Sequence, residues 1–182
     1  MEEKIVYFEK PGAENTDTVI HLVQDCVTKK GIKKIVLAST RGNAARAFAK
    51  AFEGKDIQLI VVPWQYSFAG EDEQPFPQSL VKELQMNGHI VHFGTMLFHT
   101  DELYGVKSPQ LIANTLRIIA QGFKVCVEIL MMATDGGCVK KGEKVIVVAG
   151  SSHGSDTAVV ATAAPSNRMN LLRIHEILCK PL

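Results

Sequence analysis

Two polar loops carry residue types that can hold an anionic group. The first, Ser39-Thr40-Arg41-Gly42-Asn43, stands between an apolar β-branched run and a helical pattern. Such residues at the start of a helix suit a phosphate, because the first amides of a helix carry partial positive charge and arginine adds a bidentate contact. They also suit an ordinary turn in which Thr40 or Asn43 only caps the helix. The sequence leaves both interpretations open.

The second polar loop follows another apolar run and precedes Thr157. Its residues are Gly150, Ser151, Ser152, His153, Gly154, Ser155 and Asp156. Glycines, serines and a histidine at the end of a strand suit an anion or a polar ring, although a flexible hairpin loop has a similar composition. The presence of two such loops at strand ends favours one shared crevice.

A long irregular stretch from Pro63 to Pro77 is rich in aromatic and acidic side chains. Loops of this length inside a compact domain are usually functional or mobile. Trp64 and Tyr66 follow a third apolar run, so we expect them at the same strand edge, where they are candidates to stack on a flat ring. For each aromatic residue taken singly, packing of the loop on the surface is the favoured interpretation. Thr95, in the loop after a fourth run, is placed at the crevice by topology alone.

Other residues give weaker signals. His89, His92 and His99 cluster around one strand and loop, but they lack the spacing of a metal site, so we predict no bound metal. Glu128 stands in an apolar helical pattern and is either a buried carboxylate or part of a solvated edge. Cys138 has no evident histidine or aspartate partner, and we interpret it as a small buried thiol rather than a nucleophile.

The elements that must position these residues follow from hydrophobic periodicity. We expect strands over 5–8, 35–38, 58–62, 89–93, 144–149, 157–163 and 174–179, and helices over 15–30, 43–52, 78–87 and 109–135, the last broken near Gly122. This alternation predicts a single α/β domain over residues 1–182: a three-layer αβα sandwich on a mostly parallel sheet with an antiparallel edge. The two strands around loop 150–156 should pair antiparallel, and the last strand should lie at an edge.

Composition excludes several classes of partner. The 182 residues are 46% hydrophobic and 21% charged with a net charge of +1, so no basic field exists for nucleic acid or an anionic membrane surface. No apolar run approaches the ~18 residues that span a bilayer. The four cysteines are scattered, as in a reducing compartment, at Cys26, Cys126, Cys138 and Cys179. With no apolar signal stretch after Met1, we predict a cytoplasmic protein.

Both polar loops also lie in segments that resemble a known family. Residues 33–46 resemble the first conserved strand, phosphate loop and helix of the pyruvate kinase C-terminal domain, and residues 141–157 resemble its penultimate strand and glycine-rich loop. The resemblance implies a regulatory type of domain, without the catalytic barrel, in which the loop 39–43 holds a phosphate and the loop 150–154 closes the same pocket. The second loop lacks the tryptophan and arginine of effector-binding members, which disfavours a sugar bisphosphate.

We therefore expect a protein that binds a phosphorylated small molecule. Flavin mononucleotide (FMN) is the favoured ligand, because it needs one phosphate cradle and a site for a flat aromatic ring. One alternative is a flavin-dependent or phosphate-ester enzyme that uses His153, Asp156 or His99 as proton donor. Another is a regulatory module with a vestigial site. Pyruvate kinase domains assemble, so a homo-oligomer is expected by analogy.

Overall fold

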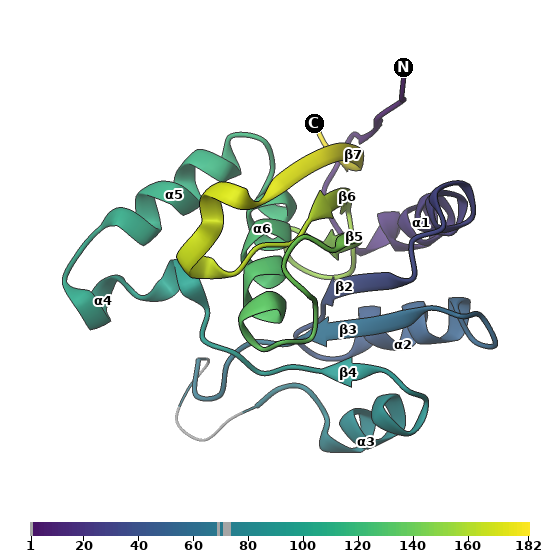
Figure 1. The fold of residues 1–182 in the computed structure, drawn as a ribbon, viewed down its shortest axis with the longest axis horizontal. Helices are drawn as coiled ribbons and strands as arrows, with labels where there is room; N and C mark the ends of the chain where they lie inside the picture. The colour runs from purple at the N-terminus through teal and green to yellow at the C-terminus, as the bar shows by residue number, and fades with distance from the viewer. Residues whose placement is uncertain (1, 69, 71–73) are drawn as a thin grey trace.

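The computed structural model describes residues 2–68, 70 and 74–182 of the chain. Within this part of the chain, strands form one sheet in the order β1-β7-β6-β5-β2-β3-β4 (Figure 1). The strands are β1 (Val6–Phe8), β2 (Lys34–Ala38), β3 (Gln58–Val62), β4 (Ile90–Val91), β5 (Lys144–Ala149), β6 (Thr157–Thr162) and β7 (Arg173–Pro181). The long loop 63–77 is described except for residues 69 and 71–73.

Strand directions confirm a mostly parallel sheet with antiparallel pairing toward one side. β1 runs parallel to β7, and β2 runs parallel to β5 and β3, while β6 is antiparallel to both β5 and β7. We expected the last strand at an edge of the sheet, and this expectation is wrong. β1 pairs with the outer side of β7, with Val6 opposite Cys179, so β1 forms the edge. A pattern of alternating side chains indicates that a segment is a strand, but it does not identify the strands that pair with it in the sheet.

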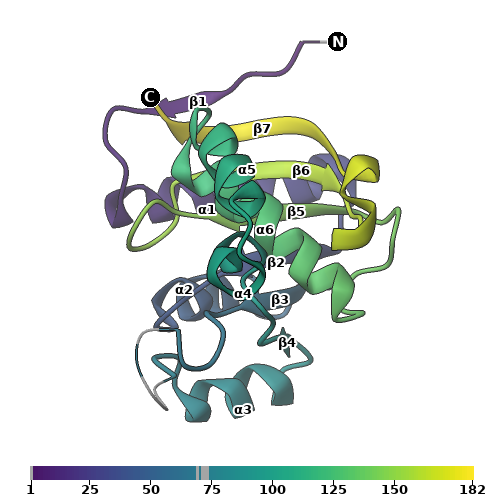
Figure 2. The ribbon, with the colours of Figure 1, turned by 90° about the vertical axis from the view of Figure 1, so that its left-hand side faces the viewer.

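Helices cover both faces of the sheet and complete the three layers (Figure 2). One face carries α1 (Thr16–Lys30), α2 (Asn43–Ala51) and α3 (Gln78–Met86), and the other carries α5 (Ser108–Arg117) and α6 (Gln121–Asp135). The short α4 (Asp101–Tyr104) precedes α5, and 3-10 turns occupy η1 (Ala13–Asn15), η2 (Leu97–His99) and η3 (Ser166–Leu171). No helix among the described residues is long and apolar enough to cross a membrane.

The helix expected over 109–135 is two helices, and the break lies before Gly122. Ala120 has extended backbone angles (φ −174°, ψ 155°) and separates α5 from α6. Gly122 is inside α6, where a Cβ atom would lie 2.2 Å from the Thr157 hydroxyl oxygen. This glycine therefore permits close packing of α6 on β6 rather than breaking the helix.

The buried strands supply both halves of the core. Ile35 and Leu37 of β2 pack toward α1–α3, whereas Val36 packs toward α5 and α6, and β3 and β5 alternate in the same way. A sheet covered on both faces needs apolar residues at successive positions, which explains the continuous apolar runs in the sequence.

Acid should weaken this fold, because partial burial lowers the pKa of His89 and His92 below the usual 6.5. In addition, the unprotonated Nδ1 of His89 accepts the Leu59 N–H at 3.3 Å. The unfolded chain takes up these protons first, so their contribution is complete above pH 6.5 and is lost as the pH falls. We expect the free energy of unfolding in urea to drop between pH 7.5 and 5.5, where carboxylates remain ionised. A flat profile over this range would contradict the partial burial of neutral His89 and His92.

Candidate functional site

A cavity of about 410 Å³ opens where β2, β3 and β5 end. Ala38, Val62 and Gly150, at or just after the last residues of these strands, all line it. Because the three strands are parallel, their carboxyl ends meet at one edge, where α/β sheets usually bind ligands. The start of α2 forms one wall and α6 forms another. The volume lies within the range of small-molecule sites, roughly 300–1,000 Å³.

The first polar loop forms the α2 wall. Gly42 is the N-cap of α2, and Thr40 and Asn43 do not cap it as the turn interpretation supposed. Gly42 has φ 89°, and a Cβ atom there would lie 2.5 Å from Leu80 Cδ2, so only glycine lets this turn pack against α3. The buried Ser39 hydroxyl accepts the Ala45 N–H at 3.2 Å. Ser39, Thr40, Arg41 and Asn43 line the cavity, whereas the predicted site residue Gly42 is outside the lining. An anion there would meet a helix N-terminus beside Arg41.

The second polar loop lies opposite and is held by the N-terminal segment. The Asp156 carboxylate accepts the N–H groups of Gly12 at 3.2 Å and Ser151 at 3.0 Å. Gly154 has φ 72°, and a Cβ atom there would lie 2.5 Å from Ala13 Cα. Asp156 is fully buried and outside the cavity lining, so it shapes the loop instead of facing a ligand. The structure therefore gives no support to Asp156 as a proton donor.

Residues 150–154 of this loop reach the cavity. Gly150, Ser151, Ser152, His153 and Gly154 all line it. Ser152 and His153 are exposed at the tip, and the Ser152 hydroxyl lies 2.8 Å from Nδ1 of the His153 ring. The two polar loops therefore share one cavity, although they are more than a hundred positions apart in sequence.

Of the two aromatic residues expected at this strand edge, one lines the cavity. Trp64 lines the cavity and meets Phe68 edge to face, with ring centroids 5.1 Å apart. Tyr66, by contrast, is outside the lining: its ring packs on Phe93 at 5.0 Å, and its hydroxyl accepts the Gln78 amide at 3.2 Å. Phe68 lines the cavity, where we had expected Tyr66. A strand end fixes the first residues of a loop, but the loop's own turns decide which later side chains face inward.

Thr95 is also outside the cavity lining. Its side chain is exposed, and the next residue, Met96, faces inward instead. The Met96 N–H donates to the Gln65 side-chain oxygen at 2.8 Å, which ties the loop after β4 to the loop after β3. The loop after β4 therefore reaches the cavity through Met96 and not through Thr95.

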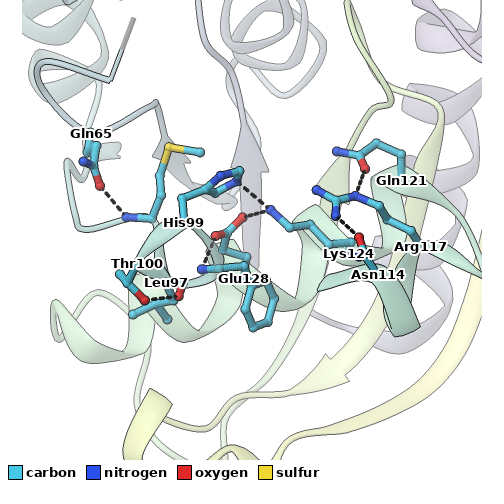
Figure 3. Close-up of polar contacts among 11 residues, drawn as sticks. Gln65, Leu97, His99, Thr100, Asn114, Arg117, Gln121, Lys124 and Glu128 are labelled. Carbon is cyan, nitrogen blue, oxygen red and sulfur yellow. Dashed lines mark hydrogen bonds and ion pairs between the residues drawn. The ribbon is translucent and has the colours of Figure 1, made fainter. Parts of the chain in front are cut away.

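An unexpected polar cluster, His99–Lys124–Glu128, forms the α6 side of the cavity (Figure 3). The Lys124 ammonium contacts Glu128 Oε2 at 2.5 Å and His99 Nε2 at 3.1 Å. Glu128 Oε1 accepts the Phe98 N–H at 2.8 Å. Glu128 is only 2% exposed, so the solvated-edge interpretation is wrong. Lys124 escaped the sequence analysis, although a lysine and a glutamate four residues apart in an apolar helix were a usable signal.

Burial governs the electrostatics of this cluster. The side chain of Lys124 is 1% exposed, and burial lowers its pKa against the opposing attraction of Glu128. The pKa of His99 is lowered first by burial and then by the neighbouring Lys124 charge. Titratable groups with shifted pKa values in a cavity are candidates for function rather than for stability alone.

The remaining reactive side chains lie elsewhere. His92 packs against Gly136, where a Cβ atom would lie 2.2 Å from its ring, and His89 contacts β3. Cys138 is half-buried, and its pKa is raised by burial. None of the three lines the cavity. Among the residues that the structure describes, no group of His, Cys, Asp and Glu could hold a metal ion.

The sequence of the chain matches a known family. Residues 17–175 match the family model of the pyruvate kinase alpha/beta domain. The chain belongs to this family. The match runs from α1 into β7, so it includes both polar loops and α6. This match confirms the resemblance seen in residues 33–46 and 141–157 and extends it over most of the chain.

Proposed function

We propose that this protein binds a phosphorylated small molecule in the cavity, with FMN as the ligand. One observation carries the proposal: residues 39–41 and 43, residues 150–154 and the Trp64–Phe68 pair line the same cavity. A phosphate would sit at the start of α2 beside Arg41, where amides without intrahelical partners and a guanidinium favour a dianion. The aromatic pair would then contact the flat ring.

The first test is an absorption spectrum of the freshly purified protein, followed by denaturation and mass analysis of the released molecule. We expect flavin bands and a released mass equal to that of FMN. If the protein is colourless, FMN should be added and its fluorescence titrated. No change in FMN fluorescence or mobility up to millimolar protein would refute the proposal.

Arg41→Ala should weaken the binding of FMN by about 10- to 100-fold, the equivalent of one charge-assisted contact. The matched control is Arg46→Ala, because Arg46 lies in the helix α2 that follows Arg41, is outside the cavity lining, and pairs with Glu83 at 3.2 Å. The measurement is the Kd of each variant for FMN and for riboflavin, which lacks the phosphate. Equal losses for both flavins would show that Arg41 does not hold the phosphate.

A second candidate is a phosphate-ester enzyme in the same cavity. It is favoured by the position of His99, whose imidazole lines the cavity beside Lys124. Hydrolysis would release riboflavin and inorganic phosphate from FMN and water, a reaction that ³¹P NMR follows directly. An unchanged FMN signal after prolonged incubation would rule this reaction out.

A further inference from the structure

The ammonium group of the His99–Lys124–Glu128 cluster has more N–H donors than hydrogen-bond acceptors around it. An ammonium group has three N–H bonds. In the described part of the chain, two acceptors are within hydrogen-bond distance of Lys124 Nζ: one oxygen of Glu128 and one nitrogen of His99. Figure 3 shows both contacts on one side of the lysine, while Arg117 bonds to Gln121 and Asn114. The Phe98 ring also lies beside the ammonium group, with its centroid 5.4 Å from Nζ, so one N–H of Lys124 has no oxygen or nitrogen acceptor among the described residues.

A buried ion pair needs an explanation other than stability. Taking two charges out of water is unfavourable, and apolar residues of similar volume are often as stable. Both side chains are nearly inaccessible, yet both belong to the cavity lining. The other carboxylate oxygen of Glu128 is fixed by the Phe98 N–H, so the pair holds the lysine at a set place in the wall.

The charges of the pair decide what kind of group fits beside it. The positive charge of Lys124 and the negative charge of Glu128 cancel. A second anionic group of a ligand placed beside Lys124 would also face the Glu128 carboxylate. A neutral acceptor such as a carbonyl oxygen gains a charge-assisted hydrogen bond without that repulsion. The Phe68 ring meets the His99 ring at 5.1 Å, so the aromatic surface is continuous with the cluster. A ring that contacts Phe68 would therefore bring its edge toward Lys124.

We propose that the cluster is a second subsite, in which Lys124 donates to a ring carbonyl of the ligand whose phosphate is held at Arg41. The subsite rests on the proposed function and adds the recognition of the ring edge. His99 and Glu128 are positioning residues that hold the ammonium group. The two ends of the cavity then select a ligand that carries both a phosphate and a carbonyl-bearing ring.

The test compares FMN with riboflavin on two double variants. Lys124→Met/Glu128→Gln removes the donor, keeps the site neutral and leaves an oxygen for the Phe98 N–H. Lys34→Met/Glu143→Gln is the matched control, because that half-buried pair, 3.1 Å apart, also includes a glutamate that accepts a backbone N–H and lies outside the cavity lining. We expect the first variant to lose about tenfold in affinity for both flavins. The control should bind both like the wild type.

A spectroscopic readout separates a hydrogen bond to the ring from a general effect on shape. A carbonyl that accepts a hydrogen bond from a cation stretches at lower frequency. The infrared carbonyl bands of bound FMN should therefore move up in Lys124→Met/Glu128→Gln and remain in place in the control. Unchanged affinity and bands would overturn the subsite while leaving the proposed function intact. A loss for FMN but not riboflavin would place Lys124 on the phosphate and also overturn it. A wild type that binds neither flavin would overturn both proposals.

Discussion

Lys124→Met alone should lower the free energy of unfolding by about 3–5 kcal/mol. The substitution removes the partner of a carboxylate that is 2% exposed, and an uncompensated buried charge is among the most destabilising changes in a protein. Urea unfolding at pH 7.5, followed by circular dichroism, gives the free energy directly.

Two further variants isolate the cause of this loss. Lys124→Met/Glu128→Gln should recover most of it, because neither remaining side chain is charged. Lys34→Met should cost far less than Lys124→Met, since Lys34 and Glu143 are 23% and 29% exposed and water can still solvate the carboxylate. If the double variant were as unstable as Lys124→Met, lost packing and not an unpaired charge would be the cause.

Asp156→Ala should lower the free energy of unfolding by about 3 kcal/mol and release the loop 150–154 from the N-terminal segment. The carboxylate is fully buried and accepts the N–H groups of Gly12 and Ser151 and the Thr157 hydroxyl. Removing it leaves several donors without an acceptor, and each hydrogen bond to a charged group contributes about 1.5–3 kcal/mol. Urea unfolding and amide hydrogen exchange at Gly12 and Ser151 measure the two effects.

Asp156→Asn is the matched control for this prediction. The amide oxygen can still accept both backbone N–H groups, and its NH₂ can donate to the Thr157 hydroxyl, so we expect a much smaller loss. Comparable destabilisation by alanine and asparagine would mean that the charge of Asp156, and not its geometry as an acceptor, holds the loop. Unchanged exchange at Ser151 in Asp156→Ala would contradict its role in the loop.

Local chemistry made most of the fold predictable. Apolar β-branched runs that must be buried on two faces gave β2, β3 and β5, and glycines after apolar helical patterns gave the ends of α1 and α3. The same runs located both polar loops, because in a parallel sheet the residue after a strand lies at the ligand-binding edge. The same reasoning singled out Arg41 and the loop 150–154, which line the cavity.

Contacts between distant segments were beyond the reach of the sequence. The edge position of β1 depends on its pairing with β7, and the inward turn of Phe68 and Met96 in place of Tyr66 and Thr95 depends on how two loops pack together. The sequence made Asp156 a candidate proton donor, but in the structure its carboxylate accepts the N–H of the distant Gly12.

The sequence by itself determined that this chain is an α/β domain with two anion-suited loops at strand ends, because periodicity and turn chemistry are local properties. The tertiary structure alone decided that Lys124 and Glu128 line the cavity with His99 instead of forming an exposed helical pair. A lysine and a glutamate four residues apart have the same spacing in an exposed pair and in a buried pair. Only the packing of α6 against the sheet and against η2 removes the water around the pair and turns it into part of a site.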